Sequence, residues 1–194
     1  MHAAHTFFST CGSSLSVKAD MLSVAHPHEK LLIGRDAHKS VVSGLILSGI
    51  QPVWVEPRWD AELHVAHPPS AADFEAAFAA EPDAKGALVT SPTPYGSCAG
   101  LRAIADVCHR RGRPLVVDEA WGAHLPFHPD LPTWAMDARA DVCVTSIHKM
   151  GSGLEQGSDF HLQGDLMRAL VLLPMIVSGS RLAGQKAQGL MLEA

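Results

Sequence analysis

The sequence lacks an excess of positive charge and a long apolar run, and each absence excludes a class of partner. It carries 15 Lys and Arg against 20 Asp and Glu, for a formal net charge of −5. This balance gives no reason to expect a nucleic acid or an anionic membrane as a partner. The longest apolar run, residues 169–177, is interrupted by Pro174 and is far shorter than the roughly 20 residues of a membrane-spanning helix.

Motifs of several other function classes are also missing. The four cysteines form no Cys-x-x-Cys pair, which favours reduced thiols in a cytoplasmic protein. There is no Gly-x-x-x-x-Gly-Lys for a nucleoside triphosphate. Although the chain has 12 histidines, it has no His-Glu-x-x-His, and His26 and His28 lie in an expected turn, so we predict no metal site. The N-terminus has no basic region followed by an apolar stretch, and no signal peptide is expected.

Short apolar runs alternate with helical patterns along most of the chain, whose 47% hydrophobic and 18% charged residues are an ordinary globular composition. Continuous apolar strands separated by helices are typical of a mostly parallel sheet covered on both faces. We therefore predict an α/β fold with a three-layer, mostly parallel, seven-stranded sheet. The expected strands are residues 6–8, 31–33, 52–55, 87–89, 114–118, a run from residue 141 that ends at Lys149, and residues 159–162.

Helical spacing of apolar residues predicts the intervening helices. In the first of these we expect Leu15, Ala19 and Leu22 to share the buried face. The expected helices are residues 15–24, residues 38–47 closed by Gly49, one opened by a capping box of Ser70 and Asp73, and one that stops at Gly112.

Two charged residues follow neighbouring strands of this pattern. Lys149, preceded by His148, ends one strand, and Asp118 ends another. Residues at the carboxyl ends of such strands point into the crevice where open α/β sheets bind ligands. A lysine for a covalent imine and a carboxylate for a pyridinium nitrogen are what pyridoxal phosphate needs. Each residue alone has a plainer interpretation, since a lysine after a strand is often a solvated loop residue and an aspartate often caps the next helix.

Further segments carry groups that a phosphorylated ring would need. Residues 9–14, STCGSS, lead into a helix, where hydroxyls and free N–H groups bind anions; a plain serine cap is the alternative. His38 follows a strand and could stack on a flat ring or simply start a helix. Trp121 stays open between a packing aromatic and a cofactor neighbour, and residues 91–96 between an ordinary turn and a hydroxyl donor to the ring.

Four runs occur in the order and spacing of one family: residues 9–16 (STCGSSLS), 34–40 (GRDAHKS), 117–124 (VDEAWGAH) and 146–149 (SIHK). In this combination the chain resembles the major domain of the Orn/Lys/Arg decarboxylases, which are fold-type-I pyridoxal phosphate enzymes. The resemblance covers about residues 6–164. It implies the large-domain fold of that class and the decarboxylation of lysine, ornithine or arginine to the corresponding amine and CO2, as in polyamine and amino-acid metabolism.

The resemblance also implies a role for each matching residue. Lys149 would bind the cofactor covalently, and Lys149 or His148 would be the general acid at Cα, so the expected catalytic residues are Lys149, His148 and Asp118. Asp118 would bind the pyridine nitrogen and His38 would stack on the ring. The implied partners are a small amino-acid substrate and further copies of the chain, as a dimer or higher homo-oligomer in the cytoplasm. The expected cofactor-binding residues are Ser13, Ser14, His38, Asp118, Ala120, Ser146, His148 and Lys149.

The chain departs from the family in length. We expect an incomplete major domain at residues 1–164 and a divergent tail at residues 165–194, without the family's small C-terminal domain. Such a chain is expected to associate or to be poorly soluble, and to have impaired activity. Two other classes stay open. One is another fold-type-I enzyme, an aminotransferase or a lyase, which would share the lysine and the aspartate. The other is a non-catalytic remnant of such an enzyme, which would lack turnover.

Overall fold

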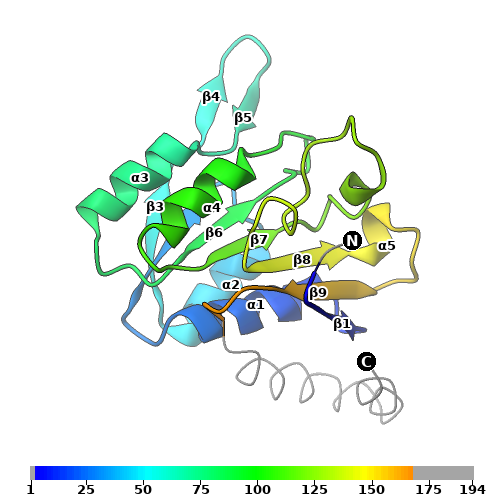
Figure 1. The fold of residues 1–194 in the computed structure, drawn as a ribbon, viewed down its shortest axis with the longest axis horizontal. Helices are drawn as coiled ribbons and strands as arrows, with labels where there is room; N and C mark the ends of the chain where they lie inside the picture. The colour runs from blue at the N-terminus through cyan, green and yellow to red at the C-terminus, as the bar shows by residue number, and fades with distance from the viewer. Residues whose placement is uncertain (1–2, 168–194) are drawn as a thin grey trace.

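Seven strands form one mixed sheet in the computed structural model, which describes residues 3–167 (Figure 1). Its strand order is β1-β9-β8-β7-β6-β2-β3, and the five strands from β8 to β3 are parallel. β9 runs antiparallel between β8 and β1. The predicted mostly parallel sheet is confirmed, while the tail predicted at residues 165–194 lies outside the described residues from residue 168 onward. The strands are β1 (His5–Ser9), β2 (Lys30–Gly34), β3 (Gln51–Val55), β6 (Ala87–Thr90), β7 (Leu115–Asp118), β8 (Val142–Ser146) and β9 (Ser158–Leu162).

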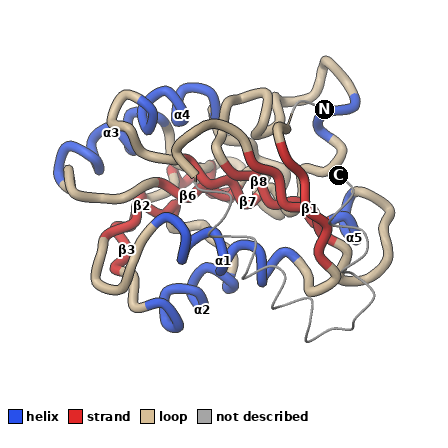
Figure 2. The backbone as a smooth tube through the Cα atoms, turned by 60° about the horizontal axis from the view of Figure 1, so that its bottom comes forward, coloured by secondary structure: helices blue, strands red, loops and turns tan. Residues whose placement is uncertain are grey.

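Two pairs of helices cover the two faces of the sheet (Figure 2). α1 (Ser13–Val24) and α2 (Lys39–Ser48) lie on one face, and α3 (Ala71–Ala80) and α4 (Leu101–His109) lie on the other. Within residues 3–167, no helix combines the length and apolar character needed to cross a membrane.

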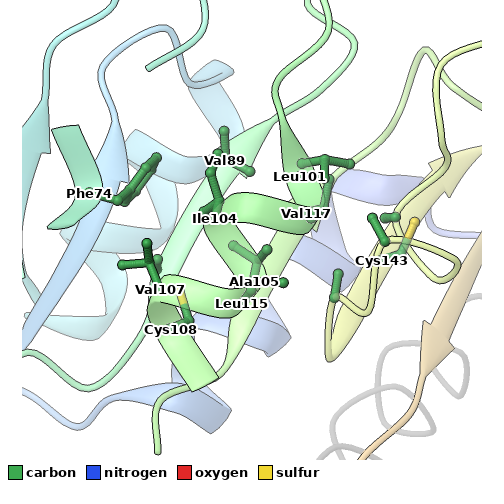
Figure 3. Close-up of a cluster of buried hydrophobic side chains, with 14 of the residues drawn as sticks. Phe74, Val89, Leu101, Ile104, Ala105, Val107, Cys108, Leu115, Val117 and Cys143 are labelled. Atoms are coloured by element: carbon green, nitrogen blue, oxygen red, sulfur yellow. The ribbon is translucent and has the colours of Figure 1, made fainter. Parts of the chain in front are cut away.

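Side chains alternate between two apolar cores because successive strand residues point to opposite faces. Val117 of β7 packs in the core under α3 and α4, with Phe74 and Ile104 (Figure 3). Its neighbour Val116 packs in the other core, with Met21 of α1. Both faces of the central strands are therefore buried, as their unbroken apolar sequences predicted.

Local signals fix several helix ends. The Ser70 Oγ accepts a hydrogen bond from the Asp73 N–H, and the Asp73 carboxylate accepts one from the Ser70 N–H, so the predicted capping box is confirmed. Gly49 ends α2 in the left-handed conformation, with φ 70°, which a glycine adopts without steric cost.

Three features of the fold differ from the sequence prediction. The face predicted for the first helix is wrong in part: Ala19 is buried, whereas Leu15 and Leu22 are only half-buried. A small hairpin, β4 (Arg58–Asp60) and β5 (Val65–His67), projects from the body of the fold and was not predicted (Figure 1). Each hairpin strand has only three residues and no fully buried position, so no apolar alternation marks it. Two short helices, η1 (Leu125–Phe127) and α5 (Ile147–Met150), were also missed.

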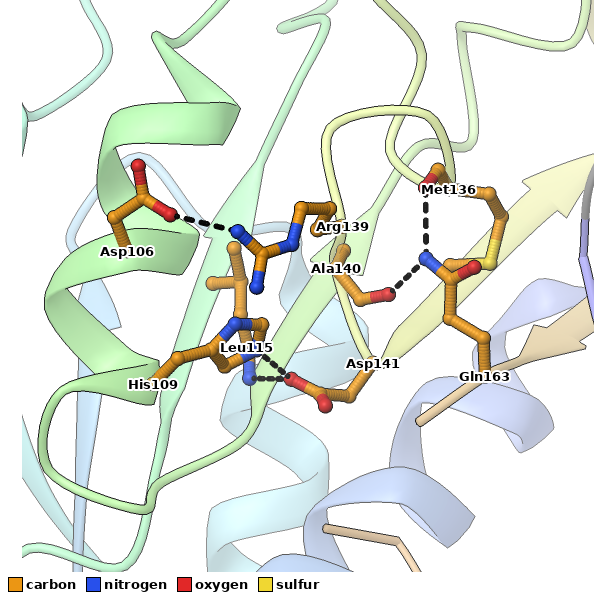
Figure 4. Close-up of polar contacts among 8 residues, drawn as sticks. All are labelled: Asp106, His109, Leu115, Met136, Arg139, Ala140, Asp141 and Gln163. Carbon is orange, nitrogen blue, oxygen red and sulfur yellow. Dashed lines mark hydrogen bonds and ion pairs between the residues drawn. The ribbon is translucent and has the colours of Figure 1, made fainter. Parts of the chain in front are cut away.

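A polar cluster ties together the edge of the sheet at which β7 and β8 begin (Figure 4). The Asp141 Oδ2 accepts a hydrogen bond from the Leu115 N–H at 2.8 Å and lies 2.9 Å from the His109 Nε2. The Gln163 amide, just after β9, donates to the carbonyls of Met136 and Ala140, each at 2.7 Å. This cluster holds three neighbouring strands at one edge, and the motif residues lie at the opposite edge.

Candidate active site

The carboxyl ends of three parallel strands bring the motif residues together. Asp118 is the last residue of β7 and Ser146 the last of β8. Thr90, the last residue of β6, pairs in register with Asp118. Lys149 follows on α5, one turn after β8. Parallel order therefore places residues from distant motifs at one edge, where open α/β sheets bind their ligands.

A pair of serines joins the start of α1 to the end of β8. The Ser13 Oγ lies 2.7 Å from the Ser146 Oγ, although the two residues are 133 positions apart. Gly12 precedes the helix with φ 74° and supplies no capping side chain, so the first N–H groups of this 12-residue helix have no side-chain cap. Ser14 lies in the same turn. Two hydroxyls beside an uncapped helix N-terminus form a site suited to a phosphate.

Asp118 is a buried carboxyl, 3% exposed, at the centre of this edge. Its Oδ1 accepts a hydrogen bond from the Ala120 N–H at 3.2 Å. Burial raises the pKa of Asp118, and the Ala120 N–H, the charge of Lys149 and the nearby His38 oppose that rise. A cationic group placed against this carboxylate would therefore be stabilised by it.

Lys149 is half-buried against an aromatic side chain. Its Nζ lies 4.4 Å from the centroid of the Trp121 ring. Burial lowers the pKa of Lys149, while the charge of Asp118 opposes that shift. A lower pKa leaves more of the amine uncharged near neutral pH, which is the state that attacks a carbonyl carbon.

The two predicted histidines have defined local contacts. The His148 Nδ1 lies 3.0 Å from the Gly157 carbonyl oxygen, so it must carry a proton to donate, and the neutral ring then has Nε2 as its acceptor. His38 caps α2, since its Nδ1 accepts a hydrogen bond from the Ser40 N–H at 3.2 Å. His38 thus lies at the start of α2, as its position in the sequence allowed.

Other residues of the site were not assigned from the sequence. Thr90 has a buried hydroxyl without a hydrogen-bond partner in the described part of the chain, and it lies in register with Asp118. Asp20 of α1 is fully buried, and both its carboxylate oxygens lack a partner there. The charge of Asp118 contributes to raising the pKa of Asp20, after the larger effect of burial. The signals in the sequence were a polar residue within an expected helix, for Asp20, and one directly after an expected strand, for Thr90.

These donors and charges fit pyridoxal phosphate. The serine pair and the start of α1 suit its phosphate, and the Asp118 carboxylate suits a protonated ring nitrogen. Lys149 supplies an amine with a lowered pKa. The unpaired hydroxyl of Thr90 is a further polar group that a ligand at this edge could satisfy.

Comparisons with known proteins find decarboxylases of basic amino acids. A family model described as "Orn/Lys/Arg decarboxylase, major domain" matches residues 1–183, past residue 164 where the motif resemblance was expected to end. An arginine decarboxylase of Halalkalibacterium halodurans is 42% identical over 167 residues, which are 86% of this chain and 34% of that protein. One of Bacillus subtilis is 38% identical over 181 residues, which are 92% of this chain and 37% of that protein.

A solved structure shares the fold as well. Lysine decarboxylase A from Pseudomonas aeruginosa matches with a TM-score of 0.74 at 25% identity, covering 98% of this chain and 31% of that one. The chain thus spans about a third of the length of the relatives it matches.

Proposed function

The chain belongs to the Orn/Lys/Arg decarboxylase family, through its major domain, and on that premise we propose that its site serves the pyridoxal phosphate-dependent decarboxylation of a basic amino acid. The observation that carries the proposal is the convergence of Lys149 and Asp118 at one edge of the sheet, beside the paired serines Ser13 and Ser146. When bound, pyridoxal phosphate supplies a conjugated ring that accepts the electron pair released as the substrate carboxylate leaves as CO2.

The residues around the phosphate and the ring would orient the cofactor. Ser13 and Ser146 would donate their hydroxyls to the phosphate, with Ser14 in the same turn of α1. Asp118 would hold the ring nitrogen in its protonated form, and the Ala120 N–H fixes the Asp118 carboxylate for that contact.

Three side chains would act on the reacting groups. Lys149 would hold the cofactor covalently and, once displaced by the substrate amine, carry the proton that is delivered to Cα. His148, with its Nδ1 held by the Gly157 carbonyl, can present its Nε2 as an alternative proton carrier. His38, fixed as the cap of α2, would cover the ring.

We propose arginine as the first substrate to test, because the two curated relatives described above are arginine decarboxylases. Lysine follows, since the matching solved structure is a lysine decarboxylase. Ornithine completes the set that the family name allows.

We also propose that the chain works as a homo-oligomer in the cytoplasm. Large apolar side chains are exposed near the edge that carries the site: Phe8 by 69%, Tyr95 by 82% and Leu154 by 90%. Phe8 lies near the end of β1, Tyr95 follows β6 and Leu154 precedes β9, so a second copy that covers them would also cover the site.

Covalent labelling tests the assignment of the lysine. The full chain would be incubated with pyridoxal phosphate, reduced with borohydride and mapped by peptide mass spectrometry, with Lys149→Arg as the control. We expect the label on Lys149. A label spread over Lys18, Lys39 and Lys85, with none on Lys149, would contradict the proposal. Release of labelled CO2 from carboxyl-labelled arginine, lysine and ornithine would then identify the substrate.

A further inference from the structure

Glu119 is a fully buried carboxyl that directly follows Asp118, and no role assigned above uses it. We propose that Glu119 is a positioning residue, an uncharged carboxylic acid that ties the loop after β7 to strand β8 and thereby fixes Trp121 against Lys149. The inference rests on the proposed function only in treating Lys149 as the reactive amine.

The hydrogen bonds of Glu119 join three parts of the chain. Its Oε2 accepts a bond from the Ala135 N–H at 2.7 Å, and the Cys143 thiol of β8 donates to the same oxygen at 3.5 Å. Its own N–H donates to the Val144 carbonyl at 2.9 Å, and its carbonyl accepts from the Gly122 N–H at 2.8 Å. One residue therefore holds both ends of the loop at residues 119–135, and holds them to β8.

The turn that carries Trp121 packs directly on the Glu119 side chain. A Cβ at Gly122 would lie 2.4 Å from the Glu119 Cγ and 2.7 Å from its Oε1, so only glycine fits there. Trp121 precedes this glycine, and its ring centroid lies 4.4 Å from the Lys149 Nζ. A change in the Glu119 side chain would reach Lys149 through these two contacts.

The surroundings of Glu119 favour its uncharged form. The titratable groups that face it are the thiols of Cys143, on β8, and Cys98, before α4, and neither can supply a positive charge. Its Oε1 is buried and has no hydrogen-bond partner among residues 3–167. Ionisation would leave an unpaired charge in the interior, which is costly. Burial accordingly raises the pKa of Glu119 to about 8.

The test follows Lys149 in the cofactor-free full chain. Lysines would be reductively methylated with carbon-13 formaldehyde, and the Lys149 signal assigned by its loss in Lys149→Arg. We expect its NMR shift to show a small step near pH 8, as Glu119 ionises, besides the titration of Lys149 itself. Glu119→Gln keeps an acceptor for the Ala135 N–H but cannot ionise, so the step should vanish while the Lys149 midpoint stays.

Glu119→Ala removes the side-chain hydrogen bonds of Glu119 to the Ala135 N–H and the Cys143 thiol. The midpoint of the Lys149 titration should then rise by about one pH unit, which is a tenfold loss of uncharged amine at neutral pH. Glu62→Gln, at the exposed tip of the hairpin, is the matched control and should change nothing. A step near pH 8 that persists in Glu119→Gln would overturn the proposal. The Glu119→Gln variant therefore tests the proposal even if Glu119→Ala fails to fold. Because no cofactor is present, failure to label Lys149 with pyridoxal phosphate would leave this result intact.

Discussion

The Nζ of Lys149 lies 4.4 Å from the centroid of the Trp121 ring, and this contact has two opposing electrostatic effects. The ring face attracts the ammonium form and favours the charged state. The same ring excludes water and favours the neutral state. Burial lowers the pKa of Lys149 and outweighs the opposing charge of Asp118.

Two substitutions at Trp121 separate these effects because they change the pKa of Lys149 in opposite directions. Trp121→Leu keeps an apolar cover without an aromatic face, so the pKa of Lys149 should fall further, by less than about one unit. Trp121→Ala admits water and should raise it. The carbon-13 signal of dimethylated Lys149 would report both, and shifts of the same sign would show that the ring acts through only one effect.

Substitution of Asp118 by Asn should separate stability from cofactor binding. The charge of Asp118 raises the pKa of Lys149, so its loss should lower that pKa further. Because the folded pKa of Asp118 is itself raised, the carboxyl costs stability above its unfolded pKa of about 4, and the cofactor-free variant should be more stable at neutral pH. Pyridoxal phosphate should bind more weakly. Urea unfolding measures the stability, and absorbance titration measures the affinity for pyridoxal phosphate. A variant that is both less stable and unimpaired in cofactor binding would contradict the assignment of Asp118 to the ring nitrogen.

The burial of the Asp20 carboxyl should make the stability of the fold depend on pH. Burial raises its pKa well above the ordinary value, so the folded chain keeps a proton that the unfolded chain loses above about pH 4. The free energy of unfolding should therefore fall as the pH rises from about 4 towards neutrality. Asp20→Asn removes this dependence and should be more stable than the parent by at least about 1 kcal/mol at neutral pH, with no such gain below about pH 4.

The matched control for Asp20→Asn is Asp83→Asn, because Asp83 is an exposed aspartate after α3. Its unfolding curves should follow those of the parent chain at every pH. An equal gain in both variants would mean that net charge, not the burial of Asp20, governs the effect.

Gly122 should tolerate no side chain. A Cβ there would lie 2.4 Å from the Glu119 Cγ and 2.9 Å from the Pro92 Cδ, so Gly122→Ala should cost about 1–3 kcal/mol of stability. Gly100→Ala is the control, since a Cβ at Gly100 has open space around it. Thermal unfolding of the two variants gives the comparison, and equal melting temperatures would refute the close packing of this turn.

Much of the fold was predictable because its signals are local. The central strands are unbroken apolar runs, and the capping box of Ser70 and Asp73 can be recognised from four consecutive residues. The order of the motifs along the chain was enough to predict which strand ends meet, since parallel strands share one edge.

The remaining features depend on contacts between distant residues. Nothing near Trp121 in the sequence shows that its ring meets Lys149, and Glu119 looks like a second acidic residue of a surface loop. The face of α1 was misjudged because two polar residues, Ser16 and Asp20, lie on its buried side, where the hydrophobic pattern gives no sign of them. The hairpin of β4 and β5 has too few residues to carry a period.

The pairing of β1 with β9 has a consequence for how this protein is made. Within residues 3–167, β1 pairs only with β9, so β1 leaves the ribosome without its pairing strand until residue 162 has been synthesised. Ser13 likewise waits for Ser146. A chain that stops before β9 would therefore expose β1 as an unpaired strand, and one that stops before residue 146 would also leave the Ser13 hydroxyl without its partner.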